Sequence, residues 1–430
     1  MLHFFLKFAS VIQMKFLVLT QFYTPETGAA QTRLKEFTAA LANSGHTVEV
    51  FTAMPNYPLG RIFDEYKGRF YDCEVQGQIK IHRVWLFAAL GRSLSRLLCY
   101  FSFTFFCFFA FLVCKRPDYI FVNSGPLFLV LPGRFLAWVF RCKLILNVAD
   151  LWPRSVEKLD GAVFKFLIKF SRGLEAWAYS TSDYVVAVTE GIRTALLDEK
   201  KVPSDKVLFL PNGVNTTLFD PGNAEPIPSL DLVKILDKKF VFIYPGNHGY
   251  AHALDNVLDA AKIIQNEAAN DSELNQIHIL LIGDGSEKRR LVEKANSLRL
   301  TNLMFHEPVS SEHLVPILKK SQVGLINVKN SSLASETRPA KMFPIMAMGK
   351  AILFSGFGEG ANLLSEVKGG RVVEPENPQA LATEMMNFFK NKYDLNQMGI
   401  NNRNFVKSKM EFSSLINEWL QDLFRREGKI

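Results

Sequence analysis

Short apolar runs alternate along most of the chain with longer segments in which apolar residues recur at helical spacing. Continuous apolar runs are typical of parallel strands buried on both faces, and helical segments between them suit crossover connections. This pattern predicts an α/β protein built from doubly wound sheets. The predicted strands are residues 14–20, 48–51, 118–122, 144–148, 184–188, 240–244, 277–282, 303–305, 323–326 and 351–354.

The two halves of the chain share this plan, and a Pro/Asn-rich patch at residues 210–228 separates them. A chain of 430 residues suits two domains of ordinary size. We predict an N-terminal Rossmann-like domain over 14–205, a C-terminal one over 206–410 and a crossover helix over 411–430. We expect the amphipathic tail helix to pack back on the N-terminal domain. Doubly wound domains bind ligands at the carboxyl ends of their strands, so we expect the site in a cleft between two facing domains.

The segment 97–114 is almost wholly apolar and is flanked by basic residues at both ends. It reaches the length that a membrane-spanning helix needs. The strands predicted before and after it should belong to one sheet, and this argues against a single crossing. We therefore favour a helix lying in the membrane surface. A buried core helix is the second interpretation of this segment, and a spanning helix is the third.

Residues 1–13 resemble a signal peptide, but Lys7 interrupts the apolar run and no clear small-residue cleavage site follows. Cleavage there would also destroy the predicted first strand. We expect Met14 to be the natural start, which makes residues 1–13 an upstream extension or a flexible arm.

The chain carries a net charge of +8. A basic surplus suits nucleic acid, an anionic membrane or phosphorylated substrates, and the lack of long single-sign runs argues against nucleic acid. The five Cys are odd in number and show no Cys-x-x-Cys spacing, which fits a reduced cytosolic compartment. Metal-binding spacing and an Asp-x-Asp pair are both missing, so we predict no metal site.

One stretch, residues 335–351, joins an irregular polar segment to a short apolar helix. Pro344 is tolerated only in a first helical turn, so the helix should begin near Met342. Gly349 is well suited to end it. A helix N-terminus offers unpaired N–H groups and a partial positive charge, which together attract anions.

Charged side chains stand at the start of this helix. Arg338 and Lys341 lie where an anion would bind, and Glu336 lies just outside, where its carboxylate is placed to accept from ligand hydroxyls. The alternative is an ordinary capped junction between a loop and a helix.

Several glycines follow predicted strands, at positions where the backbone has to approach a ligand. Together with the helix at Met342 they suggest a nucleoside diphosphate held by main-chain N–H groups, although each glycine alone also fits a tight turn. Asp150 stands just after the predicted strand 144–148, where it is either part of the site or a cap of the loop. The glycines are Gly28, Gly246, Gly249, Gly283 and Gly285.

The stretch from Glu336 to Gly349 resembles the hallmark of retaining glycosyltransferases of family 4, which have the GT-B fold. That hallmark is Glu-x7-Glu followed by an Ala-Met-Ala-like helix, and Glu336 and Met346-Ala347-Met348-Gly349 fit it. The similarity covers almost the whole chain from Met14. Asp150-Leu151-Trp152-Pro153 and Pro211-Asn212-Gly213-Val214 look like the bacterial O-antigen and capsule branch, which includes transferases of N-acetyl-fucosamine-type sugars.

The resemblance implies a metal-independent retaining glycosyltransferase without a cofactor. It would move a sugar from a UDP-sugar to a polyprenyl-diphosphate-linked saccharide in bacterial surface polysaccharide synthesis, at the cytoplasmic face of the inner membrane. The implied catalytic residues are Glu336, which would bind donor hydroxyls, and Asp150, on the acceptor side. The implied donor-binding residues are Gly28, Gly246, Asn247, His248, Gly249, Gly283, Arg338, Lys341 and Met342.

The chain departs from the family pattern at three places. Pro344 replaces the second Glu, which usually binds ribose, and Thr337-Arg338-Pro339 replaces a Gly-rich segment. The Arg and Lys usual after the Gly246 loop are absent, and His248 and His252 lie nearby instead. We hypothesise that Arg338 supplies the missing cation, and we predict weakened donor affinity.

These departures keep a second interpretation open, in which the chain is a non-catalytic GT-B scaffold or a lipid-binding partner in a polysaccharide assembly complex. The presence of Glu336, Lys341 and Asp150 favours the enzyme. A UDP-sugar epimerase of similar fold is a third interpretation, and the apolar segment 97–114 argues against it, because such an enzyme has no reason to visit a membrane.

Overall fold

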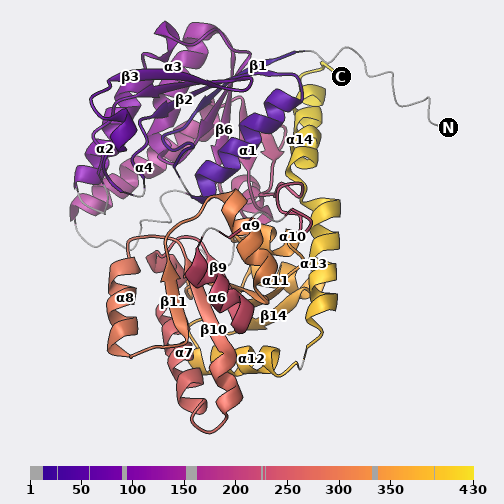
Figure 1. Cartoon of the computed structure of the whole chain (residues 1–430). Coiled ribbons are helices and arrows are strands. Elements are labelled where there is room, and N and C mark those ends of the chain that lie inside the picture. Colours follow the sequence, from indigo (N-terminus) through magenta and orange to yellow (C-terminus); the bar gives the residue numbers. More distant parts are fainter. Residues whose placement is uncertain are drawn as a thin grey trace, which may run out of the picture. The chain divides into compact units, whose positions relative to one another are not determined.

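The structure is a computed structural model, and it describes residues 13–26, 28–57, 59–89, 94–151, 162–223, 226–227, 229–331, 338–391 and 393–430. Within these residues the chain folds as two compact units, each built on a sheet covered by helices (Figure 1). The first unit consists mainly of residues up to Pro211 together with Ile416–Ile430, and the second mainly of Asn212–Leu415.

An eight-stranded sheet forms the centre of the first unit, in the order β3-β4-β2-β1-β5-β6-β7-β8. All neighbouring strands are parallel except β3, which runs antiparallel to β4 at the edge. The strands are β1 (Lys15–Leu19), β2 (Thr47–Ala53), β3 (Tyr71–Gln76), β4 (Ile79–Val84), β5 (Tyr119–Asn123), β6 (Lys143–Val148), β7 (Tyr184–Ala187) and β8 (Val207–Phe209).

The predicted border at residue 205 falls short of the first unit. β8 pairs with β7 along the edge of the sheet, with Val185 opposite Val207. The backbone hydrogen bonds of β8 therefore belong to the first unit, which extends to Pro211.

The described helices of this unit pack against both faces of its sheet. The core on one face joins Leu17 and Phe51 of the strands to Phe103 of α2 and Leu136 of α3. The helices and 3-10 turns that the argument uses are α1 (Ala29–Asn43), α2 (Leu94–Cys107), η2 (Ala110–Leu112), η3 (Leu127–Leu129), α3 (Val130–Phe140), α4 (Ala162–Thr181) and α5 (Glu190–Thr194).

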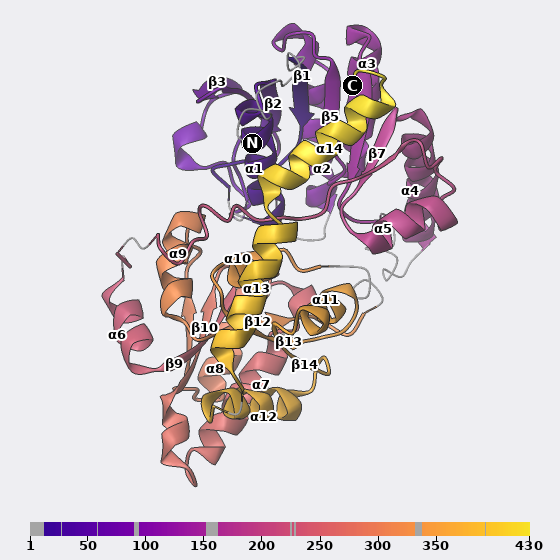
Figure 2. The same cartoon turned by 90° about the vertical axis from the view of Figure 1, so that its right-hand side faces the viewer.

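The C-terminal helix α14 (Phe412–Arg426) covers part of the other face of this sheet (Figure 2). The buried ring of Trp419 lies 5.6 Å from that of Phe37 in α1 and 6.2 Å from that of Phe121 in β5, between ring centroids. Beyond the helix, Glu427 accepts a hydrogen bond of 2.6 Å from the hydroxyl of Tyr184. The expectation that the tail packs back on the N-terminal domain is confirmed.

The apolar segment 97–114 forms most of α2 and all of η2. The strands β2 and β5 on either side of it both pair with β1, as the argument against a single crossing requires. By length and composition the window Ser95–Leu112 is apolar enough to cross a membrane, and 28% of it is buried. One side of α2 joins the core through Cys99 and Phe103, and the other side is exposed.

The second unit contains a six-stranded parallel sheet in the order β11-β10-β9-β12-β13-β14. Counted along the chain this order is 3-2-1-4-5-6, which is that of a doubly wound dinucleotide-binding fold. The strand order reverses between β9 and β12, where such folds bind ligands. The strands are β9 (Phe240–Pro245), β10 (Ile277–Ile282), β11 (Leu303–His306), β12 (Val323–Asn327), β13 (Ala351–Ser355) and β14 (Gly370–Val373).

The short helix α10 (Met342–Ala347) begins at the predicted residue and has Pro344 in its first turn. Gly349 follows it with a φ of 65°, a left-handed conformation that glycine adopts without strain. The remaining α-helices described in this unit are α6 (Leu230–Lys238), α7 (Asp255–Glu267), α8 (Lys288–Ser297), α9 (Ser311–Lys320), α11 (Glu359–Val367), α12 (Pro378–Phe389) and α13 (Leu395–Lys409).

Candidate donor-binding site

The amino group of Lys341 lies against the glycine that follows β9. A Cβ atom placed on Gly246 would lie 3.1 Å from Lys341 Nζ, so the absence of a side chain there leaves room for the lysine. Lys341 Nζ donates to the hydroxyl of Tyr244 and sits 3.7 Å from the centre of that ring. A cation and a bare backbone therefore meet where the strand order of this sheet reverses.

Burial sets the ionisation of this pair. Lys341 is half-buried, and desolvation of the amine lowers its pKa well below the ordinary value. Tyr244 is fully buried, and burial raises the pKa of its hydroxyl. Because a nearby anion favours the charged form of an amine, the site is poised to gain a positive charge when an anion binds.

The loops after β9 and β10 pack backbone against backbone. Gly246 donates its N–H to Ile282 O at 2.8 Å, and a Cβ on Gly283 would lie 1.9 Å from Gly246 O. Gly283 also has a φ of +145°, which L side chains rarely adopt. The sequence pattern singled out both glycines, and this close approach is the physical reason for them.

Asn247 and His248 follow in the same loop. The carbonyl of Asn247 accepts from the Tyr244 hydroxyl at 2.9 Å, and the His248 N–H donates to Asp284 O at 2.8 Å. The His248 ring is completely buried, and burial lowers its pKa to about 4, so the imidazole is neutral. In this structure His248 contributes to the loop through its backbone, and its ring is closed off from solvent.

The start of α10 has fewer available donors than we expected. The N–H of Met342 already donates to Pro339 O at 3.0 Å. Arg338 forms an ion pair of 2.6 Å with Glu359, which engages the guanidinium that we had expected to meet the diphosphate. Of the two expected cations, Lys341 is therefore the one that lies against the Gly246 loop.

The remaining predicted residues lie elsewhere or outside the described part of the chain. Gly28 stands between β1 and α1, beyond the carboxyl end of the first strand. Asp150 follows β6 with an exposed side chain, yet the protein around it raises the pKa of its carboxyl to about 6 by desolvation. Glu336 lies outside the described residues.

A cavity of about 410 Å³ opens beside Gly249, and its lining argues against a diphosphate. Asp255, Asp259, Glu287 and Glu376 line it, against two cations, Arg290 and Lys329. Because this lining carries more negative than positive groups, the Lys341 side of the Gly246 loop is the better anion site.

Comparison with known proteins identifies the family. Residues 28–213 match the model described as "Glycosyl transferase 4-like domain", and residues 232–405 match that described as "Glycosyl transferases group 1". The chain is a GT-B glycosyltransferase of family 4.

The glycosyltransferase has relatives along nearly its whole length. It is 28% identical over 383 residues to the "Putative colanic acid biosynthesis glycosyl transferase WcaI" of Escherichia coli K12, covering 86% of this chain and 90% of that protein. It is 25% identical over 280 residues to the "Probable glycosyltransferase WbjE" of Pseudomonas aeruginosa, covering 62% and 65% of the two chains. HepE from Anabaena, solved in complex with UDP-glucose, shares the fold with a TM-score of 0.68 and 15% identity over 96% of this chain and 100% of that chain.

Tyr244 of this glycosyltransferase was not predicted as a member of the candidate site. Its hydroxyl joins Lys341 to the carbonyl of Asn247, and so links the cation to the glycine loop. A tyrosine at the end of an otherwise aliphatic and Phe-rich strand was the one available signal, because burial of a hydroxyl calls for a partner.

Proposed function

We propose that this glycosyltransferase moves a sugar from a UDP-sugar to a polyprenyl-diphosphate-linked saccharide, with retention of configuration and without a catalytic metal. The observation that carries the proposal is the amino group of Lys341 against the bare backbone of Gly246. The product would be a bacterial surface polysaccharide such as O-antigen or capsule. The similarity to a protein named for colanic acid biosynthesis supports this class of product.

The donor is inferred from chemistry and from similarity together. A lysine amine that gains a proton beside a bound diphosphate stabilises the negative charge that develops as UDP leaves, which is the main demand of this reaction. The similar fold of HepE, crystallised with UDP-glucose, supports a uridine nucleotide. Glu336 would bind the hydroxyls of the donor sugar, and Asp150 would lie on the acceptor side, as the family resemblance implies.

The acceptor is inferred from an exposed apolar surface on the first unit. Phe101 and Phe105 of α2, Leu112 of η2 and Trp138 of α3 all expose large apolar side chains, with Trp138 70% exposed. Such side chains are costly to leave in water, and aromatic rings are favoured at the level of lipid headgroups. We infer that this surface enters one leaflet, which would bring the enzyme to a lipid-linked substrate.

A basic cavity supports the same inference. Arg134 of α3 and Arg141, which directly follows α3, line a cavity of about 490 Å³. The other charged side chains of its lining are Lys15, Arg116, Lys143 and Lys429, against two acidic ones, Asp118 and Asp183. In the part of the chain that the structure describes, the three arginines have no ion-pair partner. Cations next to an exposed apolar surface suit the anionic cytoplasmic leaflet, where each contributes about 1 kcal/mol of binding.

The test of the function is UDP release in detergent with EDTA present. The purified protein receives a panel of UDP-sugars and a lipid-diphosphate-linked saccharide, and wild type is compared with Glu336→Ala and with Glu366→Ala, an exposed control in α11. We expect one donor to yield UDP in EDTA, and this release to disappear in Glu336→Ala alone. If no donor of a broad panel turns over or binds, the proposal is wrong.

A further inference from the structure

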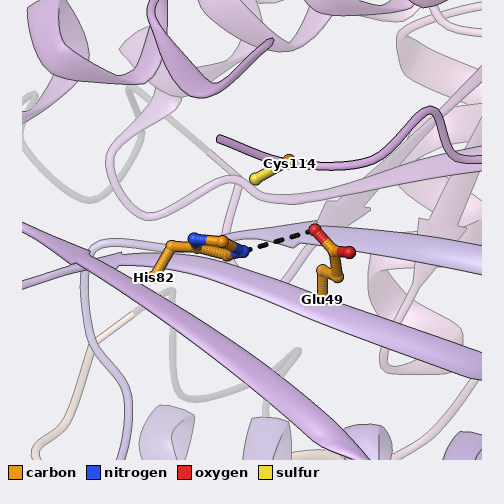
Figure 3. Close-up of side chains that lie close together, drawn as sticks. All are labelled: Glu49, His82 and Cys114. Atoms are coloured by element: carbon orange, nitrogen blue, oxygen red, sulfur yellow. Dashed lines mark ion pairs between the residues drawn. The ribbon is translucent and has the colours of Figure 1, made fainter. Parts of the chain in front are cut away.

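A carboxylate, an imidazole and a thiol meet in the interior of the first unit (Figure 3). Glu49 comes from β2, His82 from β4 and Cys114 from the loop between η2 and β5. Each offers one ligand atom, and these atoms lie within 4.8 Å of one another. All three side chains are buried, and His82 is completely inaccessible to solvent.

The His82 ring is oriented by a hydrogen bond on its far side. Its Nδ1 lies 2.7 Å from the hydroxyl of Tyr71. Its Nε2 faces Glu49 Oε2 at 3.3 Å but makes no directed hydrogen bond, although the atom is buried. When Nδ1–H donates to Tyr71, Nε2 carries the lone pair that a metal ion requires, as is usual for histidine ligands.

The carboxylate is tied to the loop that carries the thiol. Glu49 Oε2 accepts a hydrogen bond of 3.1 Å from the N–H of Lys115, the neighbour of Cys114. Glu49 Oε2 also faces His82 Nε2 at 3.3 Å, so the buried carboxylate stands beside a backbone N–H and an imidazole nitrogen. A buried negative charge is costly unless a cation lies nearby.

The thiol completes a set that suits one class of metal. The buried Cys114 sulfur lies within 4.8 Å of the ligand atoms of Glu49 and His82, and a bound ion favours the thiolate form of such a ligand. Sulfur, nitrogen and oxygen ligands together suit Zn²⁺, whereas Mg²⁺ and Ca²⁺ prefer oxygen alone.

We propose that Glu49, His82 and Cys114 bind one Zn²⁺ ion. Cys73 of β3 lies directly opposite His82 across the antiparallel pair, but its side chain is exposed and it is not part of the buried cluster. Opposite residues of such a pair point to the same face, with Cβ atoms roughly 4.5–5.5 Å apart. The alternative to a zinc site is a metal-free hydrogen-bonded triad in which the thiol donates to Glu49.

The position of the ion gives it a structural role. Two of the three ligands lie toward the amino ends of the strands, because Cys114 precedes β5 and Glu49 lies near the beginning of β2, while His82 lies past the middle of β4. Ligands of a doubly wound sheet bind at the opposite, carboxyl ends. The ion would fasten the end of the apolar segment 97–114 to β2 and β4, and hold in place the surface that carries Phe105 and Leu112.

The first test is the metal content of the full chain purified in detergent and passed over a chelating resin. We expect about one zinc ion per chain in wild type. His82→Gln and Cys114→Ser should each reduce this to below about one-tenth, whereas Cys142→Ser, a cysteine outside the cluster, should retain the ion. Tyr71→Phe should keep the ligands but weaken zinc affinity by about 10–100-fold, because the ring loses its outer hydrogen bond.

A second measurement covers the case in which the ligand variants fail to fold. Chelator-treated wild type is titrated with Co²⁺, which should give thiolate-to-metal charge-transfer and tetrahedral d–d absorption. Cys142→Ser should give the same spectrum. The proposal is overturned if wild type neither contains zinc nor gives this absorption, or if folded Cys114→Ser binds metal as wild type does. These readouts do not depend on sugar transfer, so their failure leaves the proposed function standing.

Discussion

Replacement of Lys341 by Met tests the donor site most directly. Methionine retains most of the apolar part of the side chain and lacks the amino group, which is the group that lies over the Tyr244 ring. In the free protein that group donates to Tyr244 and lies against Gly246. With UDP bound, the same group would donate to a phosphate oxygen.

The size of the effect follows from the kind of bond that is lost. A hydrogen bond to a charged group contributes about 1.5–3 kcal/mol, and each 1.4 kcal/mol changes a dissociation constant tenfold. We therefore expect Lys341→Met to raise the Kd for UDP by roughly 10–150-fold. The upper part of this range applies if the half-buried site excludes water when the nucleotide binds.

The protonation of Lys341 gives a second signature. Burial lowers its pKa well below the ordinary value in the free protein, and a bound diphosphate raises it again. Between the two pKa values binding takes up a proton, so UDP affinity falls as pH rises through that window. Below the free-state pKa the amine is already charged, and the affinity stops changing with pH.

The assay is titration calorimetry with UDP in buffers of different ionisation enthalpy, at pH values where UDP is fully ionised. Wild type should take up a proton on binding, and Lys341→Met should take up none. Lys350→Met is the matched control, because burial also lowers the pKa of Lys350, to about 8, and its amino group donates to Lys319 O at 2.6 Å. A Kd within about threefold of wild type for Lys341→Met, with unchanged proton uptake, would refute this account of the site.

Three further predictions concern the fold, the donor loop and the membrane surface. Trp419→Ala removes a buried ring from between α14 and the first sheet and should lower the free energy of unfolding by about 3–5 kcal/mol, measured by denaturant titration; a loss below about 1 kcal/mol would contradict the packing. Gly283→Ala places a Cβ 1.9 Å from Gly246 O and should abolish UDP binding in calorimetry while the first unit stays folded; wild-type affinity would show that this loop does not serve the donor. Arg134→Ala combined with Arg141→Ala should lower the partition coefficient onto anionic vesicles, measured by flotation, by roughly 30-fold. A partition coefficient equal to that of wild type would contradict the basic cavity as a lipid contact.

Much of the fold could be predicted because its strands are buried on both faces. A strand of that kind appears in the sequence as a continuous apolar run, and the runs at 277–282 and 323–326 correspond to β10 and β12 within one residue. β3 escaped prediction because it lies at the sheet edge, is largely exposed and carries polar residues throughout. β8 is only three residues long, which is too short for a periodic signal. Because β8 was not predicted, the border of the first domain was placed at residue 205 instead of at Pro211.

The chemistry of the site was predictable only where it is local. Pro344 and Gly349 fixed the limits of α10 because their backbone preferences act on neighbouring residues. The partner of Arg338 could not be predicted in this way, since Arg338 precedes α10, Glu359 lies in α11, and the ion pair depends on how these two segments fold together.

The sequence by itself determined the alternation of strands and helices, the glycine turns and the family, because each is recorded in neighbouring residues or in ordered motifs. Only the tertiary structure decided that Lys341 is the cation beside Gly246, that Tyr244 links it to the loop, and that Glu49, His82 and Cys114 converge. The physical reason is that side chains from distant segments meet only after strands pair and loops pack, and local hydrophobic patterns carry no record of those distances.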